Sequence, residues 1–271
     1  MKRHVLNQSG EVAAPVTGED ISQQLKNKID NLKLNFFDLE KGGVNYKGMK
    51  DSDAFEDYKA ATRGLASLDL DELVTREAKL AFWINIYNAL VVHGVLELDI
   101  SKSVKEVPSF FKAVCYNVGG YVFSLDDIEH GVLRGNKKKH LLSSKPFSDS
   151  DPRREFILER ADPRIHFALV CGSNSCPPIE VYEEKEIDEQ LEIVASGFIN
   201  SEEVIVDEES KKLRVSRIFK WYKDDFGGRE EVLSLIIKYR YDPKEKDFLK
   251  KAVADLRIVY NDYDWSLNLV H

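Results

Sequence analysis

The segment that most restricts the fold is the run of residues 79–98, KLAFWINIYNALVVHGVLEL, which is apolar around nearly the whole circumference of a helix. A surface helix keeps one polar face, so a helix of this composition is expected to be buried on all sides. Polar side chains interrupt it at Asn85, Asn88 and His93. Because a buried polar group requires a partner, each of them predicts either a structural hydrogen bond or a functional site.

The rest of the chain predicts helices mixed with hairpins. Gly119-Gly120 separates two β-prone runs, as the turn of a hairpin does. Residues 163–171, PRIHFALVC, are predicted to form a buried strand. With further helical patterns before residue 70 and after residue 184, and no regular βαβ alternation, the predicted fold class is α+β. In this arrangement the central buried helix packs on an antiparallel sheet, next to a helical N-terminal part.

A single globular domain is expected after a flexible N-terminal segment. Residues 1–20 are mostly polar and without periodicity, and they predict a flexible arm. No linker-like stretch interrupts residues 21–271, of which residues 21–69 supply the helical N-terminal part. At this length a chain buries roughly 75% of its unfolded surface, which is enough for a core without covalent staples.

Charge and cysteine content restrict the partners and the compartment. The chain has 39 Lys and Arg against 47 Asp and Glu, a net charge of −8. Because nucleic acids and anionic membranes attract positively charged proteins, neither is an expected partner. Three cysteines are too few for a disulfide framework, and no uninterrupted apolar run approaches the about 18 residues of a membrane span. A soluble, cytoplasmic protein is therefore expected, with its oligomeric state left open.

Cysteine–histidine chemistry is the leading functional prediction. Cys171 and Cys176 flank the sequence GSNS, and His166 precedes them. Thiol catalysis requires a thiolate, an imidazole beside it and donors for the oxyanion. In a regular strand His166 and Cys171 face opposite sides, so Cys176 is sterically the easier partner for the imidazole, and Cys171 is the alternative nucleophile. The backbone N–H groups of residues 172–175 are expected to complete an oxyanion hole.

Other polar residues offer groups for the same chemistry. His93 is an alternative general base, and Asn85 and Asn88 are predicted to orient the base or to stabilise the oxyanion. The structural alternative for His93 is a core histidine that is satisfied by a neighbouring amide or a backbone carbonyl. The residues predicted to bind the substrate are Arg164, Ser173, Ser175, Glu129 and His130.

Two further classes of function stay open. In one, the chain is a non-catalytic protein-interaction module whose polar helix is a satisfied hydrogen-bond network. In the other, His166, Cys171 and Cys176 bind zinc with His93 or His130, as in a zinc-dependent hydrolase. The chain carries no phosphate-binding loop, dinucleotide fingerprint or HExxH sequence, so no cofactor is expected. The substrate of an enzyme would be a small molecule or a peptide.

Blocks of this sequence resemble, in the same order, the family called domain of unknown function 547. The blocks lie between about residue 70 and residue 268 and are FWINIYNALVVH, LDDIEHGVLR, DPRIHFALVCGSNSCPPI, VSRIFKWYKDDFG and YDWSLN. The resemblance implies an intracellular module and assigns no activity. A more distant likeness to transglutaminase and papain-like cysteine enzymes implies acyl transfer or amide hydrolysis by a cysteine. In those enzymes the nucleophile opens the central helix, where this chain has no cysteine, so a rewired site is expected.

Overall fold

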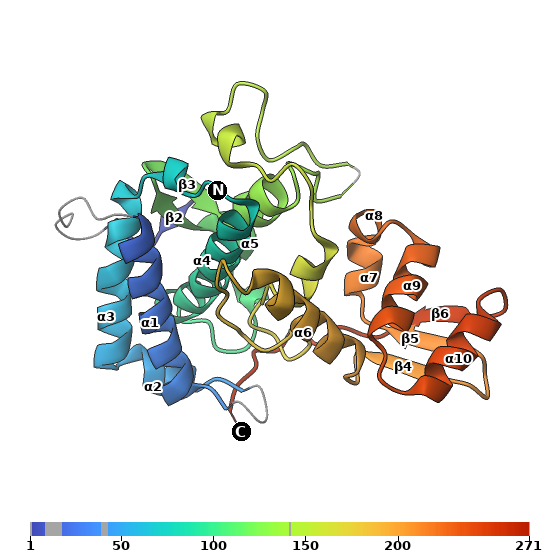
Figure 1. The fold of residues 1–271 in the computed structure, drawn as a ribbon. Coiled ribbons are helices and arrows are strands. Elements are labelled where there is room, and N and C mark those ends of the chain that lie inside the picture. Colours follow the sequence, from blue (N-terminus) through green and yellow to red (C-terminus); the bar gives the residue numbers. More distant parts are fainter. Residues whose placement is uncertain (1, 9–17, 39–42, 141, 271) are drawn as a thin grey trace. The chain divides into compact units, whose positions relative to one another are not determined.

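The computed structural model describes residues 2–8, 18–38, 43–140 and 142–270 (Figure 1). The chain divides into two compact units. Unit 1 comprises Met1–Ala161, Leu169–Ile187 and Trp265–His271. Unit 2 comprises Asp162–Ala168 and Asp188–Asp264. The prediction that residues 21–271 fold as one domain is not tested by this division.

Unit 1 is built around the long helix α4. Its helices are α1 (Gly18–Phe36), α2 (Tyr46–Lys50), α3 (Asp53–Thr62), α4 (Arg76–Glu97), α5 (Phe110–Ala113) and the π-helical segment Asp127–Leu133. Short 3-10 turns cover Arg63–Ser67, Leu70–Glu72, Val104–Glu106 and Pro152–Phe156. Its strands are β1 (His4–Val5), β2 (Val114–Val118) and β3 (Tyr121–Ser124).

Helix α4 is buried as its composition predicts. Thr75 caps its first turn by accepting a hydrogen bond from the N–H of Ala78. Among the described residues, α4 is the one helix long and apolar enough to cross a membrane, and 89% of its apolar window is buried inside the protein. A membrane span would present those side chains to lipid, whereas here protein covers them. The helix is therefore a core helix of unit 1.

The sheet of unit 1 packs against α4. Strands β2 and β3 form the predicted antiparallel hairpin, and β1 adds a parallel strand to β2. Gly119 and Gly120 turn the hairpin with φ of +59° and +81°, a region that favours glycine. Trp83 of α4 lies 4.8 Å from Phe123 of β3, measured between ring centroids.

Residues 4–7 belong to the ordered part of unit 1. Besides the pairing of β1, the buried Asn7 donates from its side-chain amide to the carbonyls of Thr62 and Asn117. Helix α1 begins at Gly18. Residues 9–17 of the predicted arm lie outside the described part of the chain.

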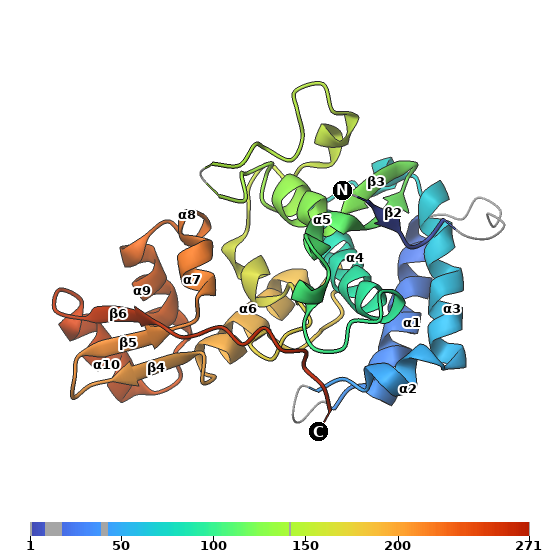
Figure 2. The same cartoon turned by 180° about the vertical axis from the view of Figure 1, so that it is seen from behind.

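Unit 2 is a smaller mixed layer of helices and sheet. Its helices are Pro163–Phe167, α6 (Ile187–Ile199), α7 (Ile218–Trp221), α8 (Lys223–Phe226), α9 (Arg229–Tyr239) and α10 (Pro243–Ala252). Figure 2 shows its strands β4 (Val204–Asp207), β5 (Lys212–Val215) and β6 (Arg257–Tyr260) side by side. Strands β4 and β5 form the predicted antiparallel hairpin, and β6 pairs with β5 in parallel. Phenylalanines dominate the core of the unit, namely Phe167, Phe198, Phe219 and Phe226.

The α+β class is confirmed, and two details of the prediction change. Each small sheet is an antiparallel hairpin extended by one parallel strand. The strand predicted over residues 163–171 is wrong: Pro163–Phe167 is a 3-10 helix, and residues 168–171 carry no regular structure. The reason is local, because Asp162 caps this helix by accepting from the N–H of Arg164 and Pro163 occupies its first position.

Candidate functional site

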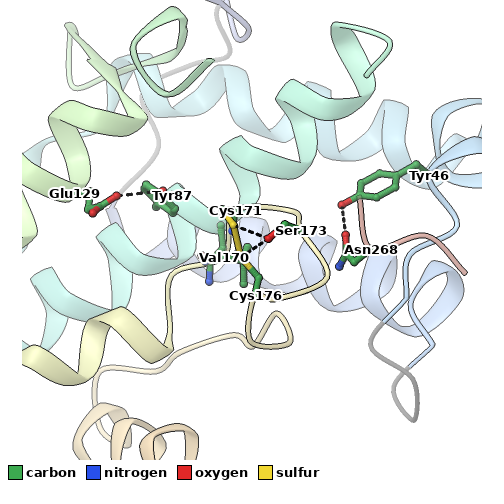
Figure 3. The surroundings of a disulfide bond; sticks show 9 residues. Tyr46, Tyr87, Glu129, Val170, Cys171, Ser173, Cys176 and Asn268 are labelled. Atoms are coloured by element: carbon green, nitrogen blue, oxygen red, sulfur yellow. Dashed lines mark hydrogen bonds between the residues drawn. A yellow bond between two sulfur atoms is a disulfide. The ribbon is translucent and has the colours of Figure 1, made fainter. Parts of the chain in front are cut away.

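The loop 171–176 in unit 1 holds the two cysteines that the sequence predicts as thiols. The structure pairs them in a disulfide whose Cα atoms lie 6.2 Å apart (Figure 3). The turn of residues 172–175 brings Cys176 back onto Cys171, and Gly172 adopts φ of +74° within it. Both cysteines are half-buried. The remaining cysteine, Cys115, is free and fully buried, and burial raises its pKa to about 11.

Polar groups of the loop surround the two sulfur atoms. The N–H of Cys171 donates to Sγ of Cys176 at 2.8 Å. The hydroxyl of Ser173 lies 3.5 Å from Sγ of Cys176 and 3.1 Å from Sγ of Cys171 (Figure 3). Ser173 is buried, whereas Ser175 is half-buried. The serine predicted to contact substrate at position 173 therefore faces sulfur.

Segments distant in sequence hold this loop in place. Asn88 of α4 accepts from the N–H of Val170 at 3.0 Å, directly before Cys171. On the other side, the carbonyl of Ser266 accepts from the N–H of Asn174 at 3.0 Å. The hydroxyl of Tyr46 donates to Asn268 at 3.0 Å within the same C-terminal segment, as Figure 3 shows. The loop is thus anchored through its backbone at several points.

The other polar residues of α4 are paired within the core of unit 1. Asn85 donates to the carbonyl of Tyr182 at 2.8 Å and accepts from its N–H at 2.9 Å. Nδ1 of His93 lies 2.7 Å from the hydroxyl of Tyr116. Burial, aided by the positive charge of Lys59, lowers the pKa of His93 to about 3. The ring is therefore neutral at pH 7, and His93 has the environment of a core residue, whereas Asn85 is half-buried.

A second group of buried polar residues surrounds the segment Asp127–Leu133. Arg134 donates to Nδ1 of His130 at 2.8 Å, and burial lowers the pKa of His130. Because a guanidinium only donates, Nδ1 is the acceptor and the ring proton lies on Nε2. The hydroxyl of Tyr87 in α4 donates to Glu129 at 3.3 Å (Figure 3). Buried charges of this kind are costly, and π-helical turns are frequent at functional sites.

The two predicted site residues of unit 2 have partners there. Nε2 of His166 lies 2.9 Å from Oδ2 of Asp225, with side chains 1% and 0% exposed. The ring of Tyr222 stacks on His166 at 3.8 Å between centroids. Sequence reasoning missed both partners, although the recognised block KWYKDDFG contains them.

Arg164 is surrounded by carboxylates of unit 2 rather than left to bind an anion. Its guanidinium pairs with Asp162 at 2.7 Å, Asp188 at 2.8 Å and Glu192 at 3.0 Å. The hydrogen bond to Asp162 raises the pKa of Arg164 above its usual value. Because these carboxylates already neutralise the guanidinium, the predicted role of Arg164 in substrate binding gains no support.

The zinc alternative gains no support either. Within the described ranges, no group of three or more His, Cys, Asp or Glu side chains is placed to hold a metal ion. The disulfide also engages both sulfur atoms that this alternative assigned to zinc.

Comparison with known proteins identifies a family and no activity. The model of the family described as "Protein of unknown function, DUF547" matches residues 71–199, from the 3-10 turn Leu70–Glu72 to the end of α6. No curated protein and no solved structure matches the chain. The family resemblance is thereby confirmed over this segment, and the papain-like likeness is not supported.

Proposed function

We propose that the chain, whose residues 71–199 match the DUF547 family model, is a thiol-dependent enzyme that transfers acyl groups or hydrolyses amides. Cys176, in its reduced form, is the proposed nucleophile. The observation that carries this proposal is the pair of groups on its sulfur, the N–H of Cys171 at 2.8 Å and the hydroxyl of Ser173 at 3.5 Å. Hydrogen bonds to sulfur favour the thiolate over the thiol, and the thiolate is the reactive form.

The proposed reaction has two half-reactions. The Cys176 thiolate attacks the carbonyl carbon of an ester, thioester or amide, and the carbonyl electron pair moves to oxygen. Collapse of this intermediate expels the leaving group, which takes up a proton, and leaves a thioester on Cys176. Water or an amine then attacks the thioester, loses a proton and regenerates the thiolate. Backbone N–H groups of residues 172–175 are the proposed donors to the oxyanion, except that of Asn174, which donates to the carbonyl of Ser266.

The general base of this reaction stays a prediction. His166 has the features of an acid–base group, because Asp225 orients its ring at 2.9 Å. His93 lacks them, because its Nδ1 engages Tyr116 and its pKa is about 3. The activity of His166→Ala and of His93→Ala tests each of the two predicted bases.

The proposed substrate is a small molecule or a peptide with an activated acyl group or an amide. The proposed compartment is the cytoplasm, where cellular reductants keep Cys176 as a thiol. Nothing in this proposal requires a nucleic acid or a membrane.

One observation favours a second candidate, a non-catalytic protein-interaction module. Asn85, Asn88 and His93 each pair with a backbone or hydroxyl group of unit 1. Such pairing gives the polar residues of α4 a structural role without any chemistry. Under this proposal, mutation of these residues lowers stability and mutation of Cys176 has no catalytic consequence.

The test is acylation of the reduced full-length chain by p-nitrophenyl acetate, with each cysteine read by mass spectrometry. We expect one acetyl group per chain, on Cys176, and none on Cys115. Cys171→Ala is the informative variant, because it removes the disulfide and retains the backbone N–H that donates to Cys176. If Cys176→Ala retains turnover, the proposed mechanism is wrong.

A further inference from the structure

The disulfide between Cys171 and Cys176 lies within reach of solvent. Both residues are half-buried, whereas Cys115 is 0% exposed. Thiol–disulfide exchange requires an attacking thiolate to approach one sulfur along the sulfur–sulfur axis, so accessibility is its first condition. The pair meets this condition, and Cys115 does not.

The loop does not depend on the sulfur–sulfur bond for its shape. Val170 is held by Asn88 at 3.0 Å and Asn174 by the carbonyl of Ser266 at 3.0 Å. Inside the loop, the N–H of Cys176 donates to the carbonyl of Ser173 at 3.0 Å. These contacts involve backbone groups and an amide, none of which changes when the disulfide is reduced. The two thiols therefore stay close enough to close again.

The bond also constrains the unfolded chain little. Cys171 and Cys176 are five positions apart, and the entropy that a disulfide removes from the unfolded state grows with the length of the loop it closes. A bridge that served mainly to stabilise the fold would join segments distant in sequence. This one joins the two ends of a single turn.

We propose that Cys171 and Cys176 form a reversible thiol–disulfide couple that exchanges with low-molecular-weight thiols and disulfides. In the oxidising direction, the Cys176 thiolate attacks one sulfur of a disulfide RSSR, forming a mixed disulfide and expelling RS⁻. The Cys171 thiolate then attacks Sγ of Cys176, forms the intramolecular disulfide and expels the second RS⁻. The net change is two protein thiols plus RSSR to one protein disulfide plus two RSH.

The structure assigns the attacking role to Cys176 because its sulfur accepts from the N–H of Cys171 at 2.8 Å. Oxidation occupies this sulfur, so the couple also switches off the nucleophile. That regulatory consequence rests on the proposed function, whereas the exchange itself does not.

The test equilibrates the native full-length chain in glutathione buffers of graded ratio, followed by acid quenching, alkylation and mass spectrometry of each cysteine. We expect Cys171 and Cys176 to change together between dithiol and disulfide as the ratio changes, in a two-electron transition. Cys115 serves as the internal control and should stay reduced throughout. In Cys171→Ala, Cys176 should accumulate as a mixed disulfide with glutathione, since the resolving thiol is absent.

Two outcomes overturn the proposal. A pair that stays oxidised in excess reduced glutathione is a permanent structural bridge. A pair that stays as two thiols in excess glutathione disulfide does not form a couple. If the titration is reversible but reduced Cys176 is never acylated, the redox couple is supported and the proposed acyl-transfer function is contradicted.

Ser173→Ala measures how far the loop activates Cys176. If loss of the hydroxyl raises the pKa of Cys176 by one unit, the thiolate fraction at pH 7 falls about tenfold. The more basic thiolate is about threefold more nucleophilic, which compensates for part of the tenfold fall in the thiolate fraction. We therefore expect oxidation by glutathione disulfide to slow about threefold, with the alkylation rate of Cys115 unchanged. An unaltered rate contradicts the assignment of Ser173.

Discussion

The polar residues of α4 and those of the loop 171–176 are both predicted catalytic, but they lie in different environments. Asn88 and His93 are enclosed in unit 1, and each engages a backbone or hydroxyl group of the same unit. Cys171 and Cys176 are half-buried, and the N–H of Cys171 donates to the sulfur of Cys176. The difference shows that a reactive residue type indicates function only when its environment leaves it accessible and favours its reactive form.

Cys176→Ala gives the sharpest test of this comparison. We expect loss of acylation by p-nitrophenyl acetate in the reduced chain, because the only activated sulfur is removed. Under the same reducing conditions we expect the melting temperature to stay nearly unchanged, because a half-buried side chain contributes little packing. The control is Cys115→Ser, which should retain acylation. Full acylation of Cys176→Ala would mean that the loop 171–176 has a structural role only, as the polar residues of α4 do.

Burial of neutral His93 predicts that the folded protein loses stability as the pH falls below about 6.5. We expect no such effect from the loop 171–176. The folded ring has a pKa of about 3 and the unfolded ring about 6.5, so the unfolded chain binds more protons between these values. The stabilisation from neutral His93 is therefore complete above pH 6.5 and falls by about 1.4 kcal/mol per unit as the pH drops toward 3. Urea unfolding of the chain and of His93→Gln between pH 7 and pH 4 measures it. A variant with the same pH slope as the parent contradicts the assignment.

Asn85→Ala should destabilise the fold without changing the redox couple. The substitution leaves the N–H and carbonyl of Tyr182 without their side-chain partner, at a cost of about 1–3 kcal/mol. Gln23→Ala on the exposed side of α1 is the control, since Gln23 bonds only the side chain of Asn27 among its described contacts. Urea unfolding compares the two. A neutral or stabilising Asn85→Ala would instead indicate that the amide is retained for function.

The smallest expected effect concerns the pH dependence of alkylation within the loop. In the reduced chain, Cys176 should react with iodoacetamide below pH 8.5, about the pKa of an unperturbed thiol. Cys115, whose pKa burial raises to about 11, should react only after unfolding. Peptide-resolved alkylation rates between pH 6 and 10 provide the measurement. Equal alkylation rates at Cys176 and Cys115 would contradict the prediction that the loop activates its cysteine and the core does not.

The sequence alone predicted what depends on local pattern. The apolar run 79–98 anticipated α4 within a few residues, because burial on every side is encoded in its composition. Gly119-Gly120 located the first hairpin, because that turn needs positive φ. The order of the sequence blocks identified the family that matches residues 71–199.

Tertiary structure decided the partners of the polar residues. Asn85 meets Tyr182 from 97 positions away and His166 meets Asp225 from 59, and no local pattern specifies such pairs. The apolar run 163–171 gave the wrong element, because a short buried run suits a capped turn as well as a strand. The proximity of Cys171 and Cys176 follows from how the turn between them folds. Periodicity encodes which face of an element is buried, whereas only the packed chain decides which polar groups meet there.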